Sequence, residues 1–320
     1  MKLILSREVI FIILTFASSL FIFSNCKNPS AERSVEKQTS YNLENPQAIS
    51  FSGEELNSSI PSSELEKKWK AKKDIYDEHP ENIDALIWYG RFTAYMGDYL
   101  GAIELYTDGI NQHPNDPRLY RHRGHRYITI RKIKEAIADF EQAKKLIQGK
   151  PNQVEPDGMP NALNIPVSTL HGNIYYHLGL AYYLKGNLES ALTSFQSCLE
   201  TSTSPDNVVS ASHWLYMILR ELNREEDANK ILKEITSEME IIENHSYYNL
   251  CLFYKGVIEE QNLIDLGEGS ANDAVMYGIG NWYRYNNQEE KGNQILNELL
   301  ERDSWNSFGF IAAESKMTKK

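Results

Sequence analysis

The stretches "YDEHPENIDALIWYG" at 76–90 and "INQHPNDPRLYRHRG" at 110–124 share one layout. Each begins near a His-Pro pair, continues through a turn rich in Asn or Asp, and ends on Gly. The His-Pro pairs begin at His79 and His113, 34 residues apart, and the closing glycines keep the same spacing. A spacing shared by several features of two segments indicates an internal repeat of 34 residues.

Small residues extend this repeat through the chain, because a Gly is followed twelve residues later by an Ala, with a ring four residues further on. The three full examples are Gly90, Ala102 and Tyr106; Gly124, Ala136 and Phe140; and Gly179, Ala191 and Phe195. Two weaker examples are Tyr216, Ala228 and Leu232, and Gly280, Gly292 and Leu296. Small residues on two antiparallel helices let the helix axes approach closely, and the ring lies on the same helix face as the Ala. Such short pairs must stack to bury their apolar faces.

This spacing resembles the tetratricopeptide repeat. The resemblance implies an all-α fold, a right-handed superhelical solenoid of about 5–6 antiparallel helix pairs. It places repeats at 83–116, 117–150, 172–205, 209–242 and 273–306. Arg123 departs from the pattern, because a large apolar residue is expected just before Gly124.

Three further segments complete the predicted solenoid, which covers 62–320. Residues 62–80 are expected to form a capping helix with Trp69 and Ile75 facing inward, and 246–266 an irregular helix pair hinged at Gly256. Residues 305–317 are expected to form a closing helix. Together these segments leave no room for a separate catalytic domain, so the chain is predicted not to be an enzyme.

The N-terminus has the layout of a bacterial lipoprotein signal peptide, predicted for residues 1–25. Two basic residues precede fifteen uncharged residues at 9–23, followed by Ser-Asn-Cys. As a helix that run would span about 22 Å, which is short for a bilayer of about 30 Å. Lipidation is therefore expected at Cys26. The alternatives are an uncleaved anchor or cleavage elsewhere, and all three place the remaining chain outside the cytoplasm, in the cell envelope.

Two segments lack helical periodicity. Residues 26–61 are rich in Ser, Asn, Glu, Lys and Gln, and are predicted to form a disordered tether after the lipidated cysteine. Residues 148–171 carry four prolines and interrupt the repeats. Insertions of this length are usually functional or disordered. This one either docks on the concave face of the solenoid or serves as a plain linker.

The sequence contains no catalytic motif for phosphate, serine or zinc chemistry. His122 and His125 are three residues apart but have no acidic or sulfur partner at a matching spacing, so they are expected on solvated helix surface, and neither metal nor other cofactor is predicted. Cys198 and Cys251 lie among apolar residues and are expected to be small buried side chains. The net charge of −11 argues against nucleic acid as a partner.

The first helix of each pair lines the inner groove in solenoids of this kind. Arginine and tyrosine on that face suit binding of a carboxylate-bearing peptide, although the alternative is that the arginines pair with neighbouring acids of the chain. The predicted groove residues are Arg91, Tyr95, Arg118, Arg121, His125, Tyr176, Tyr183 and Arg284.

These features together predict a membrane-tethered scaffold that binds protein or peptide partners, perhaps acidic ones, as in envelope assembly. That last role rests on analogy of fold and anchor alone. The alternatives are a protein that binds a small molecule or glycan and a non-catalytic regulatory subunit of an enzyme. The sequence does not determine the partner, the membrane leaflet or the oligomeric state.

Overall fold

The computed structural model describes residues 41–264 and 270–318. Cys26 and the predicted signal peptide lie outside these residues. Within them helices predominate, joined by loops and accompanied by two short strands, and no helix there is both long and apolar enough to span a bilayer. The elements before the long loop are β1 (Ala48–Ile49), β2 (Glu55–Leu56), α1 (Ser63–Glu78), α2 (Ile83–Tyr95), α3 (Tyr99–Gln112), α4 (Pro117–Thr129) and α5 (Ile133–Ile147).

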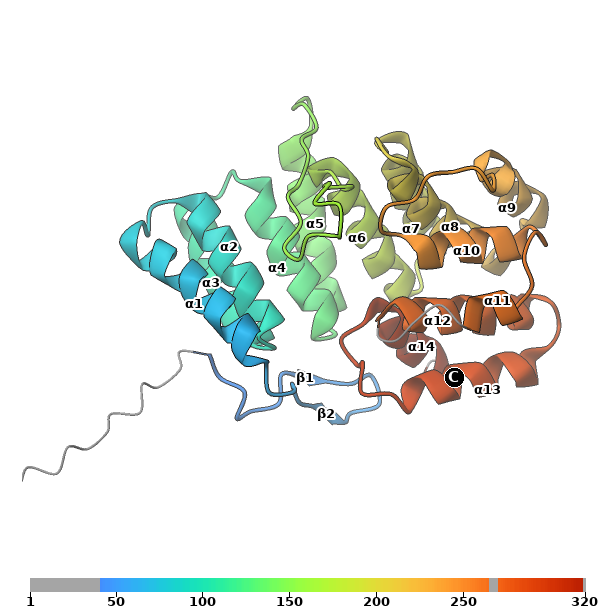
Figure 1. Ribbon diagram of the computed structural model, residues 1–320, viewed down its shortest axis with the longest axis horizontal. Coiled ribbons are helices and arrows are strands. Elements are labelled where there is room, and N and C mark those ends of the chain that lie inside the picture. The colour runs from blue at the N-terminus through green and yellow to red at the C-terminus, as the bar shows by residue number, and fades with distance from the viewer. Residues whose placement is uncertain (1–40, 265–269, 319–320) are drawn as a thin grey trace, which may run out of the picture. The chain divides into compact units, whose positions relative to one another are not determined.

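The elements after the loop continue the helical pairs. They are α6 (Leu170–Lys185), α7 (Leu188–Glu200), α8 (Pro205–Glu221), α9 (Glu225–Ile231), the 3-10 helix η1 (Leu232–Glu234), α10 (His245–Tyr254), α11 (Gln261–Ile264), α12 (Ser270–Tyr285), α13 (Glu289–Leu300) and α14 (Phe308–Thr318). Five consecutive pairs, α2–α3, α4–α5, α6–α7, α8–α9 and α12–α13, coincide with the five predicted repeats (Figure 1). The prediction of an all-α solenoid built from antiparallel helix pairs is confirmed.

The turns between pairs follow from their sequences. Backbone N–H groups of His79 and His113 cap the C-termini of α1 and α3, and donate to carbonyls one turn earlier. The side chains of Asn82 and Asp116 then accept hydrogen bonds from the first turns of α2 and α4. Side-chain caps of this kind satisfy helix-end donors that have no partner within the helix. The two His-Pro stretches are therefore helix stop and start signals, as their spacing predicted.

The predicted close crossings lie at the small residues. A Cβ atom added at Gly90 would lie 2.7 Å from the ring of Tyr106, and one at Gly124 would lie 2.9 Å from the ring of Phe140. A Cβ atom added at Gly179 would lie 2.6 Å from the ring of Phe195. These distances leave no room for a side chain, so the Gly and the ring of each pair occupy one shared volume.

Arg123 departs from the apolar pattern because it forms a pair within its own repeat. Its guanidinium donates to both carboxylate oxygens of Asp139 in α5, at 2.8 and 2.7 Å. Bidentate pairs of this kind are among the stronger polar contacts in proteins. Asp139 is 5% exposed, so this pair replaces an apolar contact between α4 and α5.

The capping helix α1 agrees with prediction at Trp69 and differs at Ile75. The Trp69 ring is buried, and its Nε1 donates to Thr93 Oγ1 at 3.0 Å. Ile75 is 46% exposed, so its predicted inward position is wrong. Tyr76 faces inward instead and stacks on Tyr89 with ring centroids 5.5 Å apart, because one residue turns a helix by about 100°.

The predicted pair at 246–266 consists of α10 and the single turn α11. Gly256 lies just after α10 with φ of +71°, a left-handed conformation that suits glycine. Its N–H donates to the Phe253 carbonyl, which closes the last turn of α10. The hinge prediction at Gly256 is therefore confirmed, whereas the second helix is shorter than expected.

Residues 41–61 form an ordered strap, although the sequence placed them in a disordered tether. Strands β1 and β2 pair antiparallel, with Ala48 opposite Leu56. The backbone N–H of Asn42 donates to Asp98 Oδ2 at 3.0 Å, and Ser58 Oγ donates to the Gly97 carbonyl at 2.7 Å. Apolar residues of the strap also reach the core, since Ala48 is buried and Tyr41 packs edge-on against Trp69 with ring centroids 5.2 Å apart. Period-based reasoning fails here because these polar and apolar contacts come from single, irregularly spaced residues.

The closing helix α14 packs against the interior of the solenoid. Its Glu314 pairs with Arg131 at the end of α4, with Arg131 Nη2 2.6 Å from Glu314 Oε2, and also accepts from the Phe51 backbone N–H in the strap. Ser315 Oγ donates to the Leu184 carbonyl of α6 at 3.1 Å. The C-terminal helix therefore fastens the strap, α4 and α6 to one another.

Candidate partner-binding groove

The Pro-rich loop between α5 and α6 lies on the first helices of the repeats and is not a plain linker. Its ends are held together by an antiparallel bridge between Val154 and Thr169. Arg91 Nη1 of α2 donates to the Pro156 carbonyl at 2.8 Å. A Cβ atom at Gly158 would lie 2.0 Å from Tyr95 Oη, so this glycine lets the loop approach α2 closely. The structure therefore selects the docked alternative.

Glu155 of the loop reaches a buried pair on α4. Its Oε1 lies 3.2 Å from Arg121 Nη2 and 3.4 Å from His122 Nε2, while Oε2 accepts from Asn173 Nδ2 of α6 at 2.9 Å. The side chains of Glu155, Arg121 and His122 are each 10% exposed or less. The expectation that His122 lies on solvated surface is wrong, and Arg121 does not face an open groove, because the loop covers both residues.

The protonation of His122 follows from its neighbour. Arg121 Nη1 lies 2.9 Å from His122 Nδ1, and a guanidinium can only donate. Nδ1 therefore accepts, and Nε2 carries the proton and faces Glu155. Burial lowers the pKa of His122 well below its usual value, and the positive charge of Arg121 acts in the same direction. His122 is thus neutral near pH 7, and the charge at this point comes from Arg121 and Glu155.

Two other predicted arginines flank this pair. Arg118 bonds to Asp116, 2.6 Å from Nη2 to Oδ2, and to Asp84 through Nη1, so it has the neighbouring acids that the sequence left as an alternative. The Arg91 guanidinium lies over the Trp88 ring, 4.6 Å from its centroid. Such a stacked arginine keeps its outer edge available for an acceptor.

The remaining predicted groove residues are covered by other parts of the chain. His125 lies against His177 and Phe308, at ring-centroid distances of 4.5 and 5.1 Å, beneath the start of α14. Tyr176 Oη accepts from Trp214 Nε1 at 2.8 Å and lies 3.0 Å from Tyr247 Oη. These contacts connect helices of the solenoid, so these rings act in packing.

Tyr183 and Arg284 belong to a different region from the loop. Tyr183 is 6% exposed, and its hydroxyl bonds to Glu221 and lies 2.7 Å from Tyr277 Oη. Arg284 bonds to Asn293 of α13 and lies 3.7 Å from Glu289. The structure therefore gathers Arg91, Tyr95, Arg118 and Arg121 around the loop and places these two elsewhere.

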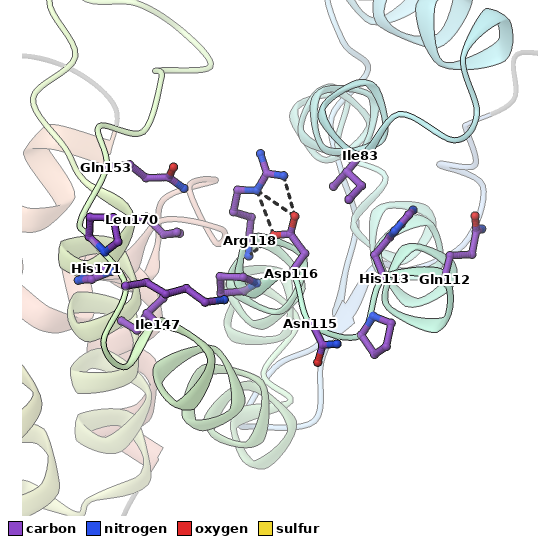
Figure 2. A pocket seen from close by; sticks show the side chains of 14 residues that line it. Ile83, Gln112, His113, Asn115, Asp116, Arg118, Ile147, Gln153, Leu170 and His171 are labelled. Carbon is purple, nitrogen blue, oxygen red and sulfur yellow. Dashed lines mark hydrogen bonds and ion pairs between the residues drawn. The ribbon is translucent and has the colours of Figure 1, made fainter.

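Two neighbouring cavities run along the edge of the loop and form the candidate groove. The larger has a volume of about 730 Å³ and lies between the α3–α4 turn and the base of the loop (Figure 2). In Figure 2, Ile83 and His113 form one wall, and Gln153, Leu170 and His171 form the other. The second cavity, of about 260 Å³, continues to Trp88, Arg91 and Glu155. The two cavities share Arg118, Gln153 and Leu170.

The described residues hold no cluster of three or more His, Cys, Asp or Glu that could bind a metal ion. Cys198 and Cys251 are buried and unpaired, as small apolar side chains would be. Burial raises the pKa of Cys198 to about 12 and raises that of Cys251 as well. Neither thiol is thus activated as a nucleophile. The groove offers shape, apolar walls and arginine.

Sequence reasoning missed Trp88, Gln153, Glu155 and Leu170. A signal for Trp88 was present, since it lies three residues before Arg91 on the same helix face. The contact between Glu155 and Arg121 had no such signal, because their pairing depends on where a loop of irregular backbone falls. The one related feature of the sequence is charge. Residues 151–169 contain acidic residues and no basic one, which is complementary to the arginines beneath the loop.

Comparisons with known proteins find one repeat of a known family and several similar solved structures. The tetratricopeptide repeat family model matches residues 172–204, which form α6 and α7. No curated protein sequence matches the chain. Among solved structures, the chain is similar to YrrB, described as a TPR protein with an unusual peptide-binding site, at 16% identity and a TM-score of 0.42, over 73% of this chain and 92% of that one. It is also similar to a tetratricopeptide repeat protein from Parabacteroides merdae ATCC 43184, at 14% identity and a TM-score of 0.45, over 80% and 93%.

Proposed function

Because the chain is a tetratricopeptide-repeat protein, we propose that it is a non-catalytic scaffold that holds a protein or peptide partner in the groove beside the loop. The observation that carries this proposal is the pair of adjacent cavities that share Arg118, Gln153 and Leu170. Two cavities in a row along helix ends and a loop suit an extended segment of chain better than a compact small molecule.

The lining of the groove defines the chemistry of the partner. Ile83, Leu170 and the ring of Trp88 offer apolar contact, while Arg91 and Arg118 offer guanidinium groups. Rigid aromatic and arginine side chains are the types that contribute most to binding at protein interfaces. A partner segment with apolar side chains and carboxylates would meet both kinds of surface.

The proposal includes a membrane tether through lipidated Cys26, with the solenoid outside the cytoplasm and a role in the assembly of envelope complexes. The apolar run at 9–23 followed by Cys26 supports this part. A lipidated protein enters the detergent phase in Triton X-114 partitioning, and Cys26→Ala removes the acyl mass from the intact protein. An unmodified Cys26 in the protein isolated from its native membrane would contradict the tether.

The groove itself is tested by filling it. Gln153 lines both cavities and its side chain is exposed, so Gln153→Trp should block the groove without disturbing folding. Gln294 on the exposed face of α13 provides a matched control, Gln294→Trp. We expect affinity capture from solubilised envelopes to yield a partner with the control but not with Gln153→Trp. If the two variants are equally stable and capture the partner equally well, the groove is not the partner-binding site.

A further inference from the structure

We propose that the first arm of the loop, residues 153–160, is a resident ligand, and that its seat on α2, α4 and α6 is a binding site for an extended acidic segment of a partner. A partner segment in the groove would extend from the second cavity, which Arg91 and Glu155 line, into this seat and compete with the arm for it. This inference rests on the proposed function and specifies the partner, which carries a carboxylate in an extended, proline-containing chain.

The contacts of the arm are those that a foreign peptide would make. One carboxylate, from Glu155, meets Arg121 and Asn173, and one backbone carbonyl, from Pro156, accepts from Arg91. Glycine at position 158 allows the backbone to approach Tyr95. Proline on either side of this acidic stretch restricts the backbone, which lowers the entropy lost on binding.

The arm is weakly attached by apolar contact. The side chains of Val154 and Met159 are 61% and 55% exposed, so they bury little apolar surface against the solenoid. The return arm of the loop is fixed differently: Val167 is 7% exposed and its carbonyl accepts from Ser204 at 3.0 Å. Two backbone hydrogen bonds join the arms, from the Glu155 N–H to the Ser168 carbonyl at 3.0 Å and from the Leu170 N–H to the Gln153 carbonyl at 2.9 Å. Release of the first arm breaks both and leaves the return arm anchored at Ser204.

The fit of Glu155 to Arg121 is incomplete. Arg121 is 8% exposed, and its Nε has no hydrogen-bond partner among the described residues. Glu155 Oε1 lies 3.2 Å from Nη2 and 3.4 Å from His122 Nε2, and it too has no hydrogen-bond partner among the described residues. A carboxylate that is not held by the loop backbone can engage Nε and Nη2 together in the bidentate geometry that guanidinium favours. An outside carboxylate can thus make a contact at Arg121 that the resident one lacks.

The burial of Arg121 also explains why the seat is always filled. A buried guanidinium without a partner is costly, so the site favours a carboxylate from one source or the other. The same charge excludes simultaneous occupation, because two carboxylates at one guanidinium would repel each other. The exchange therefore couples partner binding to release of the arm.

A peptide of residues 151–162, acetylated and amidated at its ends and labelled for fluorescence anisotropy, supplies the probe. The receptor is the chain in which residues 155–160 are replaced, at equal length, by Gly and Ser. We expect the peptide to bind this receptor and to bind the unmodified chain at least about tenfold more weakly, since the resident arm competes. A Glu155→Gln peptide should lose about tenfold in affinity for the receptor, as one charge-assisted contact is lost.

Equal binding of the peptide to the two proteins, or equal binding of the Glu155→Gln peptide, would overturn the inference. If the Gly-Ser receptor does not fold, Glu155→Gln in the full chain replaces it. Amide exchange at residues 153–158 should then accelerate at least about tenfold relative to the unmodified chain. Unchanged exchange would likewise overturn the inference. Peptide binding without partner capture would contradict the proposed function alone, so the two failures are distinguishable.

Discussion

The helix pairs and the loop are held by different kinds of contact. In the pairs, a ring fills the volume that a missing side chain leaves free, as Phe140 does against Gly124, and the two residues belong to neighbouring helices of one repeat. In the loop, Glu155 pairs with Arg121 of α4. The Pro156 carbonyl accepts from Arg91 of α2, which lies 65 residues earlier in the sequence. The helix pairs are therefore held by local, apolar, repeated contacts, whereas the candidate groove is formed by distant, polar, single ones.

The largest effect is expected where a polar contact is fully enclosed by the helical framework. Glu314→Ala removes the partner of buried Arg131 and the acceptor of the Phe51 N–H. Breaking a buried pair by removing one partner costs about 3–5 kcal/mol. Chemical denaturation should show this loss, and a loss below about 1 kcal/mol would mean that the strap and α14 contribute little to the framework.

The second-largest expected effect is destabilisation of the helical framework by acid. Burial lowers the pKa of His177 and of His213 to about 3, below the usual value near 6.5. Both are neutral when folded, so their contribution is complete above pH 6.5 and decreases as pH falls toward 3. At pH 5 each histidine should therefore lower the free energy of unfolding by roughly 2 kcal/mol relative to its value above pH 6.5. Denaturation at pH 7.5 and pH 5 measures this, and a stability that does not fall between them would contradict the assigned burial.

A smaller effect is expected at one repeat crossing. Gly124→Leu forces a side chain into the ring of Phe140, and overpacking of this kind costs about 1–3 kcal/mol despite the better helix propensity of Leu. The melting temperature should fall. A rise in Tm would show that the repeat assignment, which places Gly124 at a helix crossing, is wrong.

The smallest effect on stability is expected at the corresponding change in the loop. Gly158→Ala also introduces a close contact, but with the hydroxyl of Tyr95, which is half-buried and lies at the end of a side chain that can shift. The free energy of unfolding should change by less than about 1 kcal/mol, while protease cleavage between residues 153 and 160 accelerates. A loss as large as that of Gly124→Leu would show that the loop belongs to the framework.

The same contrast explains what the sequence could predict. The repeats, the capping turns at His79 and His113 and the hinge at Gly256 depend on patterns within a few residues, and the structure bears these predictions out. The surroundings of Arg121 depend on an irregular loop, and nothing in the local pattern of α4 distinguishes a covered arginine from a solvated one.

The ordered strap was missed for a similar reason. Residues 41–61 lack periodicity. They are ordered through single hydrogen bonds, such as those of Asn42 and Ser58 to the α2–α3 turn, and through isolated apolar contacts, such as that of Tyr41 with Trp69. Composition describes how much apolar surface a segment can bury. It does not describe which polar groups of a distant helix end still need a partner.

Site-specific photocrosslinking in the native host tests the groove most directly. A photoreactive phenylalanine derivative replaces Gln153 in the groove or, as the control, Gln294 on the outer face of α13. We predict that irradiation links a partner protein to the derivative at position 153 and not to that at 294. Identical adducts from the two positions, or none from position 153 in a protein that is folded and correctly localised, would contradict the claim that partners bind beside the loop.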